Sequence, residues 1–391
     1  MPYNFDERIP RANTNSVKYD LRKKLFGRED VLPMWVADMD FKVPPSVSEA
    51  IMERARHEIY GYSIRPESFY QSVMRWTKKR YNWSISREWM TFTPGIVPGV
   101  NLSIMILTEP GDKVMIQPPV YFPFFQAVKK NGRQLVENRL LLREGRYQID
   151  MEDFEEQLKS GVKLFILSNP HNPGGSVWTR QELKTMGELC CKYGALIIAD
   201  EIHSDIVFPG HVYTPMASIS ESIAWNTLTF LAPSKTFNIA GLSTSIGIIP
   251  NRKLRGLFNE MIERIHLWHG NIFGNVALEA AYNYGEQWLD ELLEYLAGNI
   301  ELISEYMDTR IPGMHLIKPE GTYLAWLDCR ELPVENNRIN SFMVKEAGVG
   351  MNEGSSFGEN GAGFQRLNFG CPRQTLRTAL QNIEQAVKGI Q

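Results

Sequence analysis

Hydrophobic residues in the middle of the chain form short continuous runs, separated by amphipathic segments of helical period. Such runs are typical of strands buried on both faces of a parallel sheet. Right-handed crossovers between parallel strands then place helices on both faces. The predicted strands are 91–93, 113–117, 135–142, 162–167, 195–199, 227–231 and 245–249, and the predicted helices are 46–58, 66–81, a run ending at 107, 121–130, 151–159 and 180–193.

After residue 249 the pattern changes to long helices and a few short strands, which predicts a smaller α+β domain. The predicted helices are 251–265, 273–284, 287–309, 339–347 and 374–389, and the predicted strands are 315–318, 322–327 and 364–369. We therefore predict an α/β protein with three parts. These are an N-terminal segment, 1–45, that packs with the small domain, a large domain, 46–285, and a small domain, 286–391.

Composition changes this picture little. The 391 residues are 43% hydrophobic and carry a net charge of −3, which gives no electrostatic footprint for nucleic acid or an anionic membrane. No apolar run approaches the roughly 20 residues of a membrane span, and the first residues do not resemble a secretory signal. The cysteines, Cys190, Cys191, Cys329 and Cys371, include no CxxC metal pair. We expect a reduced, cytoplasmic protein with no metal site.

Lys235 follows the predicted strand 227–231, after a break at Ala232-Pro233. Its neighbours include Phe230 and Phe237, so its ammonium group is expected to be partly desolvated. Desolvation lowers the pKa of a lysine, and a neutral amine is a nucleophile for carbonyl carbon. Taken alone, the Ser-Lys pair is better explained by a lysine that extends from a strand end into water.

Other predicted strands are also followed by residues of types that often bind ligands. The ends of these strands share one edge of a parallel sheet. They present Gly95 at a helix start, Tyr121, Asn172, Asp200 and Lys235. Each has an ordinary alternative as a turn glycine, a core aromatic or a capping residue. Together they match pyridoxal 5′-phosphate (PLP). That cofactor needs a lysine for a Schiff base, an acid facing the pyridine nitrogen and amide donors for its phosphate.

Four motifs carry a family resemblance that extends over nearly the whole chain. They are WVADMDF at 35–41, SNPHNPGG at 168–175, DEIHSD at 200–205 and SKTFNIAG at 234–241. The chain resembles the PLP-dependent enzymes of fold type I, in the class I/II aminotransferase superfamily, and within it the cystathionine β-lyase (C–S lyase) subgroup. It departs from that subgroup at Ser176, where arginine is frequent, so contacts of that loop cannot be carried over.

The resemblance implies a role for each residue around the cofactor ring. Lys235 would form the Schiff base and then move the substrate Cα proton. Asp200 would pair with the pyridinium nitrogen and keep it protonated. Asn172 would bind the ring 3-oxygen, and Tyr121 would stack on the ring. His203 would lie near the ring and Asp200, where a purely structural histidine is an equal alternative.

The resemblance also implies how the phosphate would be held. The amides of Ile96 and Val97 and the hydroxyl of Ser234 would bind it, and Tyr62 would reach it from a neighbouring subunit. The implied assembly is a homodimer with shared active sites, although surface packing is the simpler explanation of Tyr62. Many aminotransferases of the superfamily carry a phosphate-binding arginine where this chain has Ser243. Neutral Ser243 is a feature of the lyase subgroup.

The substrate side of the site is expected to contain Arg366, which matches the family's carboxylate-binding arginine. Arginine binds a carboxylate through two parallel hydrogen bonds, which lysine cannot do. Without the resemblance, Arg366 would be interpreted as an exposed arginine on a strand. Trp35, Ala37 and Asp38 are expected to line the substrate pocket, together with Tyr323.

The function implied by the resemblance is β-elimination. The expected enzyme cleaves L-cystathionine or a related cysteine S-conjugate to a thiol, pyruvate and ammonia. An aminotransferase that uses an L-amino acid and a 2-oxo acid is the alternative, because both reactions begin with loss of the Cα proton. A non-catalytic regulator on the same fold is a third possibility, but the sequence has no appended DNA-binding motif or basic patch to favour it.

Overall fold

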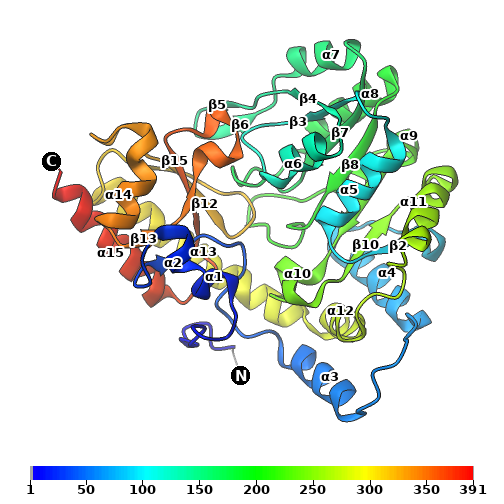
Figure 1. Ribbon diagram of the computed structural model, residues 1–391, viewed down its shortest axis with the longest axis horizontal. Helices are drawn as coiled ribbons and strands as arrows, with labels where there is room; N and C mark the ends of the chain where they lie inside the picture. Colours follow the sequence, from blue (N-terminus) through cyan, green and yellow to red (C-terminus); the bar gives the residue numbers. More distant parts are fainter. Residues whose placement is uncertain (1–2, 391) are drawn as a thin grey trace.

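A seven-stranded sheet forms the centre of the larger part of the molecule in this computed structural model, which describes residues 3–390 (Figure 1). Its strand order is β2-β10-β9-β8-β7-β3-β4. Strands β9, β8, β7, β3 and β4 are parallel, whereas β10 is antiparallel to both β9 and β2. The predicted mostly parallel sheet is therefore confirmed. The strands are β2 (Met90–Thr93), β3 (Lys113–Ile116), β4 (Gln134–Glu137), β7 (Val162–Ser168), β8 (Leu196–Asp200), β9 (Thr227–Leu231) and β10 (Ser245–Ile248).

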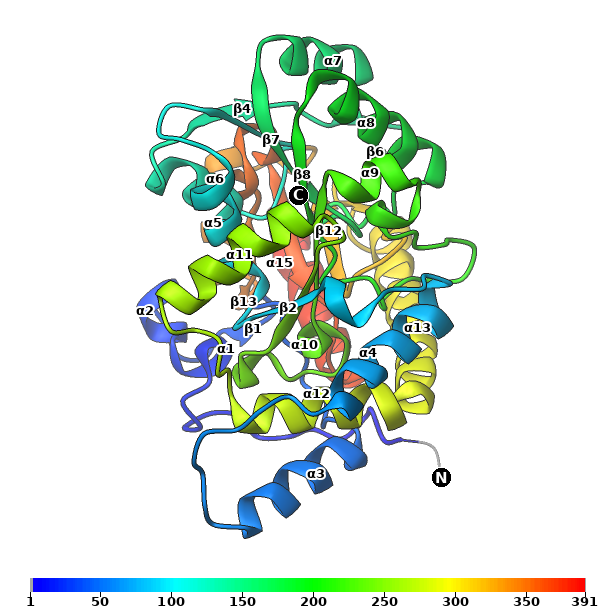
Figure 2. The same cartoon turned by 90° about the vertical axis from the view of Figure 1, so that its right-hand side faces the viewer.

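Helices cover both faces of this sheet because its strands bury alternate residues on opposite sides. Ile198 of β8 packs in one cluster with α5 (Ile96–Leu107), α6 (Pro123–Lys130) and α11 (Arg252–Arg264). Its neighbour Ile197 packs in another cluster with α7 (Met151–Lys159) and α8 (Arg180–Tyr193). Helices α3 (Pro45–Arg56), α4 (Glu67–Tyr81) and α12 (Ile272–Tyr284) complete this part, and α3 lies beside α12 at the bottom of the molecule (Figure 2).

The smaller part contains an antiparallel sheet of four strands in the order β11-β12-β15-β14. These strands are β11 (His315–Ile317), β12 (Leu324–Asp328), β15 (Phe364–Asn368) and β14 (Asn352–Glu353). They pack with α13 (Glu286–Thr309), α14 (Ile339–Lys345) and α15 (Arg373–Lys388). The two sheets fall within the predicted ranges 46–285 and 286–391, and the domain boundaries themselves stay a prediction.

One predicted strand is wrong in extent. The apolar run 135–142 was expected to form one strand, but β4 ends at Glu137 and a separate hairpin follows, β5 (Leu141–Arg143) with β6 (Arg146–Gln148). Asn138, which directly follows β4, is buried. Its side chain accepts a hydrogen bond from Gln117 and donates to the Asp150 carbonyl, both at 2.9 Å. These partners lie far away in sequence and hold the chain where the strand ends, and the hydrophobic pattern does not encode them.

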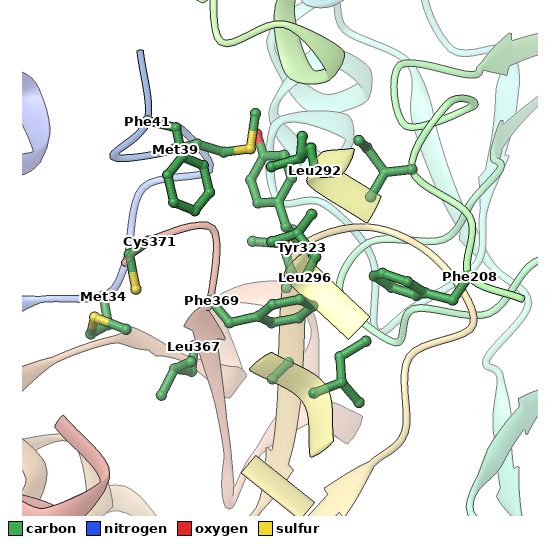
Figure 3. Close-up of a cluster of buried hydrophobic side chains, with 14 of the residues drawn as sticks. Met34, Met39, Phe41, Phe208, Leu292, Leu296, Tyr323, Leu367, Phe369 and Cys371 are labelled. Carbon is green, nitrogen blue, oxygen red and sulfur yellow. The ribbon is translucent and has the colours of Figure 1, made fainter. Parts of the chain in front are cut away.

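The N-terminal segment crosses the molecule and joins its two parts. Its short strand β1 (Leu32–Pro33) pairs with β13 (Val349–Gly350) in the smaller part. Figure 3 shows Met34, Met39 and Phe41 of this segment in one buried hydrophobic cluster with Leu292 and Leu296 of α13. The residues after β1 therefore lie in a fixed position above the carboxyl edge of the large sheet. None of the helices within residues 3–390 is long and apolar enough to cross a membrane.

A buried ion pair anchors the same segment. Lys18 has no exposed surface, and its Nζ lies 2.8 Å from Oδ2 of Asp40. Arg11 binds the other oxygen of Asp40 at 2.6 Å and also Asp38 at 2.9 Å. Short helices α1 (Val17–Asp20) and α2 (Arg22–Phe26) carry this region. Removing one partner of a buried pair is costly because the other charge stays desolvated.

We predict that Asp40→Ala lowers the free energy of unfolding by about 3 kcal/mol, because it leaves the buried Lys18 ammonium without its nearest carboxylate. Glu29→Ala is the matched control, since Glu29 pairs with Lys23 on the exposed surface and should change stability by less than about 1 kcal/mol. Denaturant unfolding of both variants measures the difference. Equal stability of the two variants would show that the Lys18 pair does not anchor the segment.

Candidate active site

A cavity of about 190 Å³ lies at the carboxyl ends of the parallel strands. This is the edge at which open α/β sheets bind ligands. The structure brings most of the predicted site residues into its wall, although they come from widely separated parts of the chain. The wall consists of Ala37, Pro94, Gly95, Ile96, Val97, Pro98, Tyr121, Ser168, Asn172, Asp200, Ile202, His203, Ser234, Lys235, Ala240, Ser243 and Thr244.

Lys235 reaches the cavity from the short helix α10 (Pro233–Thr236), which begins directly after β9. Pro233 at its first turn ends the strand, because proline fixes a helical φ and donates no ladder hydrogen bond. The Nζ of Lys235 donates a hydrogen bond of 2.6 Å to the Ala37 carbonyl. Burial lowers the pKa of Lys235 to about 8, although the charges of Asp38 and Asp200 act in the opposite direction. A large share of this amine is therefore neutral near pH 8.

Asp200 is the last residue of β8, and it is buried in the cavity wall. Its carboxylate accepts one hydrogen bond, from the Ile202 amide at 3.2 Å. Burial raises the pKa of Asp200 to about 7, and the nearby Lys235 charge lowers it only in part. A cation held in the cavity would restore the ionised form, because opposite charges stabilise each other strongly where water is excluded.

His203 lies beside Asp200 in the wall, and burial lowers its pKa to about 3, so its imidazole is neutral. Its ring meets Tyr323 edge to face, with the ring centroids 5.9 Å apart. The Nδ1 atom is buried without a hydrogen-bond partner in the described chain. A buried polar atom without a partner is costly, which favours a ligand group at this position.

The other end of the cavity is formed by the start of α5. Gly95 precedes the helix, and Ile96 and Val97 are its first residues. The first amides of a helix have no acceptor within it, and the helix dipole gives this end a partial positive charge. Ser234, Ser243 and Thr244 add hydroxyl groups to the same wall. The arrangement suits a phosphate, which binds readily at helix N-termini.

Thr244 is a site residue that the sequence reasoning missed. Its hydroxyl oxygen is buried and has no hydrogen-bond partner within residues 3–390. It precedes β10, which is antiparallel to its neighbours, so the start of this strand lies at the carboxyl edge of the others. The cofactor-binding edge was predicted from the residues that follow parallel strands, and an inserted antiparallel strand is not visible in the hydrophobic pattern.

Arg366 of β15 is only 3% exposed, so the alternative of an exposed strand arginine is wrong. Its guanidinium donates to Asn172 Oδ1 at 2.9 Å, to Asn352 Oδ1 at 2.7 Å and to the Trp35 carbonyl at 3.1 Å. These acceptors are all neutral, and its Nε has no partner in the described chain. Burial lowers the pKa of Arg366 to about 10. A buried cation that lacks a carboxylate is arranged to receive one from a ligand.

Several expected residues lie outside the cavity wall. The Asp38 carboxylate binds Arg11, 27 residues earlier in the chain, instead of lining the cavity. Tyr323 is buried behind the wall and donates to the Ala37 carbonyl at 2.9 Å. The Trp35 side chain donates to the Lys18 carbonyl at 3.0 Å and also lies outside the wall.

Tyr62 lies away from the cavity of its own chain. It is 92% exposed, and its ring stacks on His269 with the centroids 4.7 Å apart. No contact within the described chain brings its hydroxyl to the phosphate end of the cavity. Any role there requires a second copy of the chain.

Comparisons with known proteins identify the family. The sequence model described as "Aminotransferase class I and II" matches residues 29–383, and the chain belongs to this family. It is 44% identical to cystathionine beta-lyase PatB of Bacillus subtilis, over 98% of this chain and 100% of that protein.

Solved structures agree with this assignment. One is a PLP-bound Clostridium difficile protein provisionally described as an aminotransferase, at 46% identity and a TM-score of 0.97, covering 98% of this chain and 100% of that one. Another is the PLP-bound C–S lyase of Staphylococcus hominis, at 35% identity and a TM-score of 0.91, covering 99% and 98%. The fold is therefore that of the PLP-dependent enzymes of fold type I.

We predict that the Lys235 amine titrates near pH 8 in the cofactor-free protein, because its burial disfavours the charged form. The rate at which an acylating reagent labels Lys235 at different pH values, followed by peptide mass spectrometry, measures this. A lysine in a short reference peptide, labelled in the same tube, should titrate near its usual value of about 10.4. If Lys235 and the peptide lysine gave the same labelling curve against pH, the effect of burial would be contradicted.

Proposed function

We propose that this protein is a PLP-dependent carbon–sulfur β-lyase that releases a thiol, pyruvate and ammonia from L-cystathionine or related cysteine S-conjugates. The observation that carries the proposal is the meeting of Lys235, with its lowered pKa, and buried Asp200 in one cavity. The match to a cystathionine β-lyase over the full length of both chains supports the same reaction class.

The residues present fit the cofactor. Lys235 would hold its aldehyde carbon, and Asp200 would offset the charge of its pyridinium nitrogen. The hydroxyl of Thr244, buried without a partner, and the first amides of α5 would bind its phosphate. Asn172 and Tyr121 also line the cavity and would contact the ring. When bound, PLP supplies an electron-accepting ring that stabilises the negative charge left by loss of the Cα proton.

The chain's own residues would orient the substrate and move its protons. The Arg366 guanidinium, already held by three neutral acceptors, would bind the substrate carboxylate. The Lys235 amine, once free of the cofactor, would remove the Cα proton as a general base whose pKa lies close to the working pH. The Ala37 carbonyl accepts a hydrogen bond from this amine and so would direct it.

An aminotransferase is the second candidate, favoured by the Clostridium difficile protein described provisionally in those terms. Both reactions use the same base and the same carboxylate-binding arginine. The difference lies in whether a leaving group at Cβ departs before a proton returns. Ser243 supplies a hydroxyl to the cavity where many aminotransferases carry a phosphate-binding arginine, and this favours the lyase.

We further propose a homodimer in which Tyr62 completes the phosphate site of the partner subunit. A surface hollow of about 560 Å³ lies between α3 and α12. Next to it, Ile59, Tyr60, Tyr62 and Ile64 are all more than half exposed. Exposed apolar clusters of this kind mark protein interfaces, and the same segment carries Tyr62, which is not among the residues of the cavity wall of its own chain. A cytoplasmic location is proposed as well, because all four cysteines are free and three are buried.

Incubation of the purified protein with L-cystathionine, PLP and no added oxo acid tests the reaction. We expect pyruvate and a free thiol, and we expect Lys235→Ala to reduce their formation by roughly a thousandfold or more, because it removes both the cofactor link and the base. The exposed-lysine variant Lys163→Ala is the control and should retain activity. Amino-group transfer that requires an added oxo acid, with no thiol released, would establish the aminotransferase instead.

Arg366→Lys should reduce kcat/KM for L-cystathionine by roughly a hundredfold, mainly through a higher KM, because lysine cannot form two parallel bonds to a carboxylate. Arg330→Lys is the matched control, since Arg330 pairs with Asp328 at the exposed end of the same sheet. Steady-state kinetics of both variants measure the difference. A KM for Arg366→Lys equal to that of the control would remove Arg366 from substrate binding.

A further inference from the structure

A buried carboxylate outside the cavity wall links the segment that follows Asp200 to the helix that carries Lys235. Asp205 is 4% exposed and lies on the loop that follows β8. Its Oδ2 accepts a hydrogen bond of 2.8 Å from the Thr236 hydroxyl. Thr236 is fully buried and directly follows Lys235 in α10. The tether therefore joins the loop after β8 to the helix after β9.

The same carboxylate is fixed from a third element. Its Oδ1 accepts hydrogen bonds from the Tyr81 hydroxyl at 2.6 Å and from Trp76 Nε1 at 3.0 Å. Both donors belong to α4, which packs on the large sheet through its buried face. Two of the three donors to Asp205 thus belong to α4, and they fix its carboxylate independently of α10. It provides a fixed point for Thr236.

Helix α10 needs such a fixed point because it has little internal support. It contains four residues, and no side-chain cap stabilises its start. Its backbone closes through the Phe237 amide to the Pro233 carbonyl at 2.9 Å, followed by the Ile239 amide to the Ser234 carbonyl at 3.1 Å. A single turn of helix is not stable by itself, so its orientation is set by contacts from outside.

We propose that Asp205 is a positioning residue: by holding Thr236 it sets where the Lys235 amine stands relative to Asp200. The proposal rests on the proposed function, in which Lys235 is the base. It assigns no chemical step to Asp205, which is not among the residues of the cavity wall and accepts its hydrogen bonds from Tyr81, Trp76 and Thr236. Displacement of a catalytic group by about 1 Å can cost roughly a hundredfold in rate, so a tether of this kind affects kcat.

Glu201 shows what a purely structural carboxylate on the same loop looks like. It is also fully buried, and it accepts hydrogen bonds from the Tyr213 hydroxyl at 2.5 Å and the Met216 amide at 2.8 Å. None of its partners belongs to α10. Glu201→Gln therefore replaces a buried carboxyl group of the same loop without releasing Lys235, and it serves as the matched control for Asp205→Asn.

The sharpest test is a pair of substitutions at Thr236. Thr236→Val keeps the shape of the side chain but removes the hydroxyl, whereas Thr236→Ser keeps the hydroxyl. We expect Thr236→Val to lower kcat for thiol release by roughly tenfold, with KM within about twofold of wild type. Thr236→Ser should retain the wild-type kcat.

A second readout needs no substrate. In the cofactor-free chain, the pH midpoint for acylation of Lys235 should rise in Thr236→Val by about half a unit or more, because a loosened α10 lets the amine reach water. Thr236→Ser and Glu201→Gln should keep the wild-type midpoint, and Asp205→Asn should shift it as Thr236→Val does. The double variant Asp205→Asn/Thr236→Val should show no larger midpoint shift than either single variant, because both substitutions act on the same hydrogen bond between Thr236 and Asp205.

If Thr236→Val keeps both the wild-type kcat and the wild-type pH midpoint for Lys235 acylation, the positioning role is overturned. An equal midpoint shift in Glu201→Gln would overturn it too, since general loosening of the loop would then explain the effect. If Asp205→Asn does not fold, the Thr236 pair decides alone. The two proposals can also fail separately. If the wild-type protein releases no thiol, but the acylation midpoints of the variants shift as expected, the lyase function is rejected and the positioning role is retained.

Discussion

The burial of charged groups around the carboxyl edge of the large sheet, including Arg366 contributed by β15, is the constraint on which the site depends. Burial lowers the pKa values of Lys235 and Arg366 and raises that of Asp200, so in each case it favours the uncharged form. Within residues 3–390, none of them has the close ion-pair partner that Lys18 has in Asp40. Desolvation without a compensating partner costs stability. A ligand that places a cation near Asp200 and an anion near Arg366 recovers part of that free energy. The cost of folding this site is therefore a source of binding energy.

The site is held together by side-chain amides that bind main-chain groups. The Asn238 amide donates to the carbonyls of Met39 and Phe41, at 2.8 and 2.9 Å, and Asn368 does the same for Val36 and Asp38. Asn238 comes from the large part of the molecule and Asn368 from β15 in the smaller one. The segment between β1 and α3 is thus fixed from both sides, and the Ala37 carbonyl meets Lys235 as a result.

The sequence was sufficient to predict most of the large sheet because buried parallel strands produce continuous apolar runs. It was also sufficient to place Asp200, Asn172 and Lys235 at one edge, since that follows from chain direction alone. The break after β4 could not be predicted, because it depends on the contacts of Asn138 with residues far away in sequence.

The same reason explains what was missed in the site. Thr244 enters the cavity through an antiparallel strand, and the Asp38 carboxylate is drawn away by Arg11. Pairing of this kind is set by tertiary packing and not by local periodicity. The links from Arg366 to Asn352 and from Asp205 to Thr236 likewise join segments that no short window of sequence compares.

The contact between Lys235 and residue 37 has a consequence for how this enzyme can vary. The acceptor is a main-chain oxygen, shared with the Tyr323 hydroxyl, so exchanging the alanine side chain leaves the acceptor atom in place. A substitution at position 37 that still fits the cavity wall would therefore leave this hydrogen bond in place. Substitutions would instead be harmful at the residues that hold this peptide group in position, such as Asn238 and Asn368. The importance of the main-chain oxygen would then be attributed to those side chains.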